Sequence, residues 1–185
     1  MKKITITLAS AIFVFMANFS MAQQTVMVGG EQMYPQKDIV SNAVNSKAHT
    51  TLVAAVQAAG LVETLQGDGP FTVFAPINDA FDKLPEGTVS TLLKPENKGT
   101  LTSILTYHVV PGKLNVAELS KLVKKGNGKA ELKTVNGGIL TVVANGANNF
   151  MLKDANGGMA NITITDVNQS NGVIHVIDAV VTPKI

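Results

Sequence analysis

The stretch GPFTVFAPINDAF, residues 69–81, changes its physical character halfway along. Its first half, residues 71–74, is a run of β-branched and aromatic side chains that follows a Gly-Pro turn and is typical of a strand. Pro76 ends that strand, because proline has no N–H to donate to a sheet. Asn78 and Asp79 then offer a side-chain cap and a negative charge to the first turn of a helix. The stretch therefore predicts a strand, a corner and a helix in direct succession.

A second stretch, GVIHVIDAVVTP at residues 172–183, has the pattern of a buried strand. It follows an Asn-Gly turn signal and is apolar on both faces from 173 to 181, which is typical of a strand covered on both sides. His175 falls on the same face as Ile177, so we expect a buried imidazole that is held by a hydrogen bond. We predict that its partner is Asn78 or Asp79.

These two stretches, with Tyr107-His108 between them, resemble the fasciclin (FAS1) domain. The two sequence boxes of that family read TVFAPINDAF and GVIHVIDAVVTP here, and the resemblance covers residues 38–183. The chain departs from the family at Ile77, where threonine or serine is usual, and this departure transfers the capping role to Asn78. The resemblance implies an α+β fold of the FAS1 type, with N-terminal helices packed on a mostly antiparallel β-meander or wedge. The structural motif residues that it singles out are Thr72, Phe74, Pro76, Asn78, Asp79, Phe81, His175 and Asp178.

The order of the predicted elements points to the same fold class. Apolar spacing and capping residues predict helices on both sides of the first stretch, and Asn-Gly turns separate short strands in the last third of the chain. Helices first and strands later indicate an α+β domain that one early strand and one final strand tie together. The predicted helices are 39–44, 52–59, 61–65, 89–93, 98–106 and 116–122, and the later strands are 107–110, 132–135, 139–144, 149–153, 162–165 and 173–181.

The N-terminus has the pattern of a secretory signal peptide over residues 1–22. Two lysines precede an apolar segment, residues 4–19, and a small-x-small cleavage site follows it. The segment is too short for the ~20 residues that span a bilayer, which disfavours a membrane anchor. We expect a flexible lead-in over 23–36 and a single domain over 37–185, exported to the periplasm or beyond the cell, with no membrane span and as a monomer.

The composition excludes several classes of function. The chain has no cysteine, which rules out disulfides, thiol nucleophiles and zinc sites built on cysteine. All 15 basic residues are lysines, so the rigid guanidinium fork that recognises phosphates and guanine is missing. Tryptophan is also absent, and the chain without its leader has equal numbers of basic and acidic residues. We therefore expect no nucleic-acid partner.

The residues show no catalytic or metal-binding pattern. His49, His108 and His175 are the only histidines, and no two of them have the i, i+4 spacing that places two imidazoles on one face of a helix. The G-x-S-x-G signature of a serine nucleophile is missing. Asp79 and Asp82 are best explained as first-turn charges of one short helix. The sequence predicts no enzyme, no metal and no cofactor.

The pair Tyr107-His108, with Val109 and Val110 after it, is the most suggestive candidate for a binding surface. Adjacent residues of a strand point to opposite faces, so one member of the pair can pack inward while the other faces out. In animal members of the family this pair is associated with integrin binding. The alternative is that the pair is a core element at which a helix changes into a strand.

Three functions stay open at this point. The resemblance implies a non-catalytic adhesion or surface-recognition module that binds a protein or polysaccharide at the cell surface or in the matrix. An alternative is a soluble periplasmic protein that binds a small apolar ligand or assists in envelope stress. A closed apolar pocket between the β-meander and the N-terminal helices would favour this alternative, whereas a fully packed interior would disfavour it. The third is an enzyme of an unrecognised kind. Titratable side chains that line a cleft would favour this function.

Overall fold

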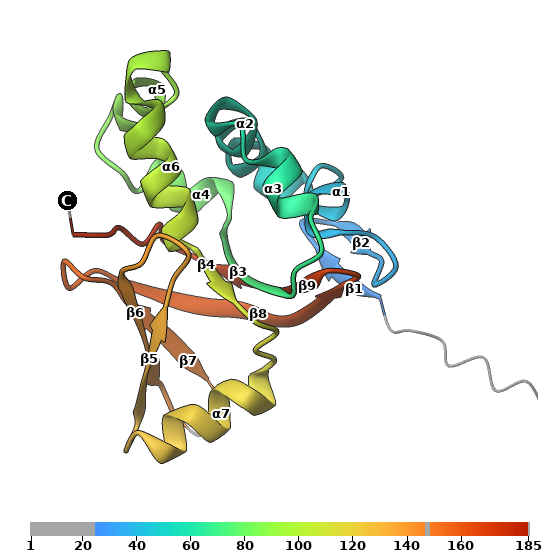
Figure 1. The fold of residues 1–185 in the computed structure, drawn as a ribbon, viewed down its shortest axis with the longest axis vertical. Coiled ribbons are helices and arrows are strands. Elements are labelled where there is room, and N and C mark those ends of the chain that lie inside the picture. Colours follow the sequence, from blue (N-terminus) through green and yellow to red (C-terminus); the bar gives the residue numbers. More distant parts are fainter. Residues whose placement is uncertain (1–24, 147–148, 185) are drawn as a thin grey trace, which may run out of the picture.

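The computed structural model describes residues 25–146 and 149–184, and the fold is α+β as predicted (Figure 1). A two-stranded sheet pairs β1 with β2, and a seven-stranded sheet has the order β4-β3-β9-β8-β7-β6-β5. The helices are α1 (Ile39–Ala43), α2 (Thr50–Ala59), α3 (Val62–Gln66), α4 (Asn78–Asp82), α5 (Thr88–Leu92), α6 (Lys98–Tyr107) and α7 (Val116–Lys125). The strands are β1 (Val26–Val28), β2 (Glu31–Met33), β3 (Phe71–Pro76), β4 (Val109–Pro111), β5 (Lys129–Lys133), β6 (Ile139–Ala144), β7 (Phe150–Lys153), β8 (Met159–Gln169) and β9 (Gly172–Ile177).

The two stretches that determine the fold lie side by side in the sheet. β3 pairs with β9 in parallel, with Phe74 opposite His175, and every residue of β9 is buried. The other strand pairs are antiparallel, and the run from β5 to β9 is a meander. At the far ends of the sheet, the Val135 N–H donates to the Val109 carbonyl oxygen at 2.8 Å. The sheet therefore curls towards a barrel.

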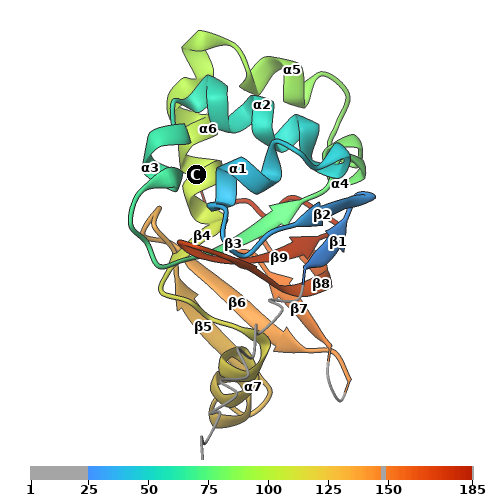
Figure 2. The ribbon, with the colours of Figure 1, turned by 90° about the vertical axis from the view of Figure 1, so that its right-hand side faces the viewer.

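The sheet has an apolar cluster on each side. Helices α1 to α6 lie over one face of β3 and β9, whereas α7 packs at the opposite end of the molecule against the meander (Figure 2). The first core, on the helical side, comprises Val28, Met33, Ile39, Val40, Leu52, Ala55, Val56, Ala59, Leu65, Val73, Ala75, Leu101, Leu105, Val109, Val167, Ile174 and Val176. The second core comprises Phe74, Tyr107, Val110, Leu119, Val123, Ala130, Leu132, Leu140, Val142, Phe150, Leu152, Ala160, Ile177 and Val181.

Several helix ends follow directly from the sequence. The Asp38 carboxylate accepts from the Ser41 N–H at 2.9 Å at the start of α1, and the Asn115 side chain accepts from the Glu118 N–H at 2.9 Å at the start of α7. Gly60 ends α2 in the left-handed conformation, with φ of 71°, which costs glycine little. α7 continues three residues beyond its predicted end at 122.

The predicted flexible lead-in, residues 23–36, contains a hairpin in its described part. β1 and β2 meet at a turn through Gly29 and Gly30, and Val28 and Met33 are buried in the first core. Each strand has only three residues, which is too short for an alternating pattern to be recognised. The predicted signal peptide, residues 1–22, lies outside the described residues.

Asn78 caps a different helix from the one predicted. Its side-chain oxygen accepts from the Thr51 N–H and the Thr50 hydroxyl, both at 3.1 Å, and its amide donates to the Lys47 carbonyl oxygen at 2.9 Å. These bonds hold the N-terminus of α2, whereas Ile77 occupies the cap position of α4 and makes no side-chain bond there. The corner after β3 therefore joins two helices that are distant in sequence.

The predicted hydrogen bond between His175 and the first box is wrong. The His175 Nε2 donates to the Leu114 carbonyl oxygen at 2.8 Å, and its Nδ1 faces the Asp166 N–H at 3.4 Å. The ring is buried and stacks on Phe74, with 5.6 Å between ring centroids. Side chains alternate between the two faces of β9, so His175 points away from the helices. Its hydrogen-bond partner therefore lies in the connection that leads into α7.

Thr72 holds the same connection. Its hydroxyl donates to the Gly112 carbonyl oxygen at 2.7 Å and accepts from the Leu114 N–H at 2.8 Å. The Asp166 carboxylate adds a bond from the Val116 N–H at 2.7 Å. Thr72, Asp166 and His175 thus fix the entry to α7 from the sheet.

Asp178 and Phe81, the last members of the motif, also have structural positions. The Asp178 carboxylate accepts from the Asn161 N–H at 2.7 Å and from its amide at 2.9 Å. These bonds hold the pKa of Asp178 below its usual value, although partial burial acts in the opposite direction. Phe81 is partly buried and packs against the first core.

Candidate functional site

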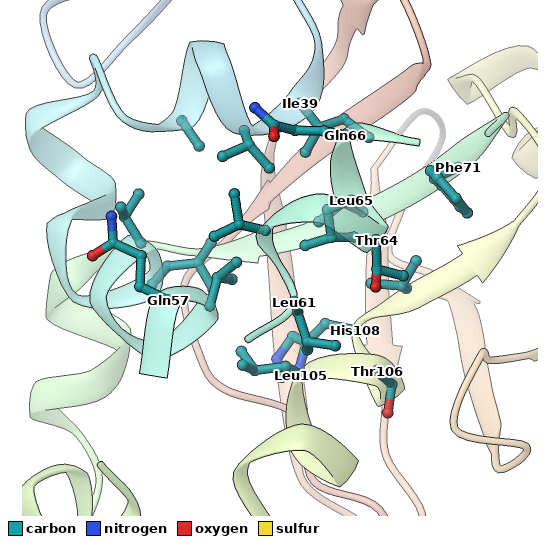
Figure 3. A pocket seen from close by; sticks show the side chains of 18 of the residues that line it. Ile39, Gln57, Leu61, Thr64, Leu65, Gln66, Phe71, Leu105, Thr106 and His108 are labelled. Carbon is teal, nitrogen blue, oxygen red and sulfur yellow. The ribbon is translucent and has the colours of Figure 1, made fainter. Parts of the chain in front are cut away.

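An apolar pocket of about 390 Å³ lies between the N-terminal helices and the sheet (Figure 3). Its walls come from α1, α2 and α3, from β3 and β4, and from the C-terminal end of α6. The central side chains are Val40, Val56, Leu61, Leu65, Val73 and Leu105. This volume falls in the range of pockets that bind small molecules, ~300–1,000 Å³.

Short helices form the helical side of the pocket. α2 ends at Gly60, where the chain turns towards α3, and Val56, Leu61 and Leu65 all line the pocket. α1 and α3 have only five residues each, and neither is long enough to cover the gap that α2 leaves over the sheet. Packing of these helices therefore leaves space where a longer helix would fill it.

His108 contributes the polar group deepest in the pocket wall, and it is fully engaged. Its Nδ1 donates to the Ile104 carbonyl oxygen at 2.9 Å, and its Nε2 accepts from the Val181 N–H at 3.2 Å. Complete burial lowers the pKa of His108 to about 4, although the Ile104 carbonyl and the Asp154 charge act in the opposite direction. The imidazole is therefore neutral at neutral pH, and it has no nitrogen to offer to a ligand.

Apart from His108, the polar residues of the pocket lie at its rim. Gln57, Thr64 and Gln66 are exposed, and Figure 3 shows them around the apolar interior. Val44 and Val135, with 55% and 45% of their surface exposed, are the apolar part of the rim. In the described part of the chain, no aspartate, glutamate or lysine lines the pocket. The site can thus bury an apolar group, but it has nothing to neutralise a charge.

The predicted binding surface of Tyr107, His108, Val109 and Val110 lies in the interior. Their exposed fractions are 0%, 3%, 6% and 4%. The reason is that Tyr107 is the last residue of α6 and His108 its cap, so the two do not alternate as strand neighbours would. This burial favours the alternative in which the pair is part of the core. His108 and Val109 face the pocket.

Tyr107 joins two turns of the meander to α6. Its hydroxyl donates to the Ile139 carbonyl oxygen at 2.6 Å and accepts from the Ala155 N–H at 3.1 Å. Burial raises the pKa of Tyr107, so the hydroxyl stays protonated and able to donate. A Cβ at Gly138 would lie 3.0 Å from the Tyr107 ring, which shows how closely the turn between β5 and β6 fits it.

The three histidines belong to separate networks. His49 is buried, its Nδ1 lies 2.8 Å from the Ser46 hydroxyl, and burial lowers its pKa. Burial also lowers the pKa of His175. Within residues 25–146 and 149–184, no group of three or more His, Cys, Asp or Glu side chains is placed to hold a metal ion.

Sequence reasoning found the helices around the pocket but not the pocket itself. The available signal was α2, which has alanine at exposed positions, Ala54 and Ala58, and at buried positions, Ala55 and Ala59. Residue types alone do not specify how far apart three short helices are placed.

Comparison with known proteins agrees with this geometry. The profile of the Fasciclin domain matches residues 47–183. The chain belongs to the fasciclin domain family. Protein sll1483 of Synechocystis sp. is 44% identical over 172 residues, which are 92% of this chain and 87% of that protein. The cell surface glycolipoprotein MPB83 of Mycobacterium bovis is 32% identical over 167 residues, which are 88% of this chain and 68% of that protein.

The fasciclin fold is also shared with a solved structure. The FAS1 domain pair of the insect cell adhesion molecule Fasciclin I has a TM-score of 0.69 at 20% identity, and the match covers 78% of this chain and 50% of that one. This likeness confirms the predicted FAS1 fold. None of the helices that the structure describes has the length and apolar character needed to cross a membrane.

Proposed function

We propose that this fasciclin domain is an exported, non-catalytic recognition module that binds a small apolar ligand in its pocket. The observation that carries the proposal is the 390 Å³ space with apolar walls between α1, α2, α3 and the sheet. The pocket is open at its rim and borders β3 and β4, whereas the sequence criterion was a closed pocket against the meander. It still favours the apolar-ligand alternative over adhesion through the Tyr107-His108 pair, because that pair is buried.

The size of the pocket supports a role in binding. Empty cavity volume costs about 24 cal/mol per Å³ in a protein core, so a dry cavity of 390 Å³ would cost roughly 9 kcal/mol. That is comparable with the whole stability of an ordinary domain, ~5–15 kcal/mol. The exposed rim admits water, which avoids that cost but leaves apolar walls hydrated. A ligand that displaces this water gains roughly 25 cal/mol for each Å² of apolar surface it buries.

The test is a fluorescence titration with N-phenyl-1-naphthylamine, an uncharged apolar dye. Val56 lies in the pocket wall, and Val56→Phe places a ring in the empty space. Ala58→Phe adds a ring to the same helix at an exposed position. We expect saturable dye binding by the wild type and by Ala58→Phe, and at least tenfold weaker binding by Val56→Phe with an unchanged or raised Tm.

Equal dye binding by all three proteins would contradict the proposal, since the dye would then bind elsewhere. Weaker binding by Val56→Phe together with a lowered Tm would indicate a damaged fold. In that case Val53→Phe, at a half-buried position of the same wall, repeats the test.

Adhesion is the second candidate, and the relatives favour it. One of them is named as a cell surface glycolipoprotein. In this function the domain would act as a monomer that holds a surface or matrix protein or polysaccharide, and the exposed apolar side chains Val44 and Val135 would be contact points. A Val44→Ser, Val135→Ser double variant that binds cells and polysaccharides as well as the wild type would exclude these residues as contacts.

A further inference from the structure

We infer that the pocket selects an uncharged amphiphile, with one apolar chain inside and a hydroxyl or carbonyl end at the rim, and that it rejects the carboxylate of the same chain length. The inference rests on the proposed function, because it names the class of ligand for that site. It follows from where the pocket has polar groups and from what those groups already bind.

The interior offers no partner to a charge. Val40, Val56 and Leu65 are buried in the wall, and His108, the buried polar group, has both nitrogens in hydrogen bonds to the backbone. A carboxylate that enters an apolar site without a cation or hydrogen-bond donors loses its hydration and gains nothing in exchange. The inner part of the ligand must therefore be apolar.

The rim offers uncharged groups that are not otherwise used. In the part of the chain that the structure describes, the side chains of Gln57, Thr64 and Gln66 form no hydrogen bond to another residue. The other two rim hydroxyls are occupied, because Ser41 donates to Asp38 and Thr106 donates to the Thr102 carbonyl oxygen. Amide and hydroxyl groups both donate and accept, so they match an alcohol, an aldehyde or an ester.

The charges near the rim also disfavour an anion. Glu63 is exposed on α3 between the pocket residues Val62 and Thr64, and Asp68 follows the same helix. Lys98 places its Nζ against Gly60 at the end of α2, and no lysine of the described chain is part of the pocket lining. A carboxylate at the rim would therefore find no lysine in the lining to pair with.

The experiment measures displacement of N-phenyl-1-naphthylamine by 1-octanol and by octanoate at pH 7.5. We expect octanol to displace the dye at a concentration at least tenfold lower than octanoate. Gln66→Lys supplies a cation at the rim, and Gln66→Leu is the matched uncharged control. We expect Gln66→Lys to strengthen octanoate binding at least fivefold without strengthening octanol binding, and Gln66→Leu to leave octanoate weak.

Each result decides between the two claims. Equal potency of octanol and octanoate, or an unchanged octanoate affinity in Gln66→Lys, would overturn the inference while leaving the pocket as a binding site. Dye that binds but is displaced by neither compound would also overturn it, because single-chain ligands would then be excluded. Failure of the dye itself to bind would instead refute the proposed function.

Discussion

The two sides of the sheet use similar apolar residues for different purposes. The second core, between α7 and the meander, has Leu119, Leu140 and Leu152 without any exposed surface. The first core lies beside a pocket of about 390 Å³ that short helices leave open at its rim. Both cores grow from β3 and β9, whose alternating side chains supply one face to each. Apolar composition therefore does not distinguish a stabilising core from a binding site, whereas helix length and placement do.

Hydrogen bonding separates the two sides in the same way. On the side of the second core, Tyr107 binds two turns of the meander, and Thr72 and His175 hold the entry to α7. On the pocket side, Gln57 and Gln66 have side chains that no neighbour holds in the described chain. The polar motif residues of the family therefore stabilise the fold, and the unpaired polar residues at the pocket rim lie outside the motif.

The largest expected effect is a difference in stability between two leucines. Leu152→Ala removes a side chain without exposed surface from the second core, so we expect a loss of about 3–4 kcal/mol in the free energy of unfolding. Leu61→Ala removes a half-buried side chain that already faces the pocket, and we expect a loss of about 1 kcal/mol. Urea unfolding measures both. Similar losses at the two positions would show that the pocket wall is packed as tightly as the second core.

The next effect depends on pH and on His108. Its pKa in the folded protein is about 4, below the 6.5 of an exposed histidine, so between these values the unfolded chain takes up a proton that the fold does not. The stabilisation is complete above pH 6.5 and is lost as the pH falls towards 4, by ~3 kcal/mol for a difference of this size. Burial of His49 and His175 acts with the same sign. Urea unfolding at several pH values in this window measures the loss.

His108→Gln is the control for this prediction. Glutamine can donate to the Ile104 carbonyl oxygen and accept from the Val181 N–H without titrating. We expect a lower stability at pH 7 but a flatter dependence on pH. A variant whose unfolding free energy falls as steeply as that of the wild type would show that His108 is not the group responsible.

The smallest effect concerns the corner after β3. Asn78→Ala removes the cap of α2 and leaves the Thr51 N–H without its acceptor, for which we expect a loss of about 1 kcal/mol. Asn78→Asp keeps the acceptor and places a negative charge at a helix N-terminus, so its loss should be smaller. Thermal unfolding compares the two. A larger loss for Asn78→Asp would mean that donation to the Lys47 carbonyl oxygen is the more important contact.

The sequence predicts the fold in most of its detail. β3 and β9 were identified from runs of β-branched and apolar residues, and β6 has its predicted bounds because turn residues flank it. Asp38 and Asn115 mark helix starts because their side chains accept hydrogen bonds from nearby backbone N–H groups. Gly60 marks a helix end because it has no side chain and adopts the left-handed conformation easily. Strand bounds and helix ends that depend on residues within about four positions of one another can thus be predicted from the sequence.

Contacts between distant segments could not be predicted. His175 binds a carbonyl oxygen 61 residues away, and Asn78 caps a helix that begins 28 residues before it. Tyr107 and His108 do not point to opposite faces as strand neighbours would, because α6 extends one residue beyond its predicted end and includes Tyr107. The pocket depends on the separation of α1, α2 and α3 over the sheet, a tertiary property that apolar spacing does not encode.

The most direct test of the account is a methyl NMR titration of the domain with N-phenyl-1-naphthylamine. The account predicts that methyl signals of pocket residues such as Val56, Leu61 and Leu65 shift with a single saturation curve. Signals of Leu140 and Leu152 in the second core should stay in place. Shifts of equal size in both cores, or no shift in the pocket, would contradict the claim that the helical side is the binding site.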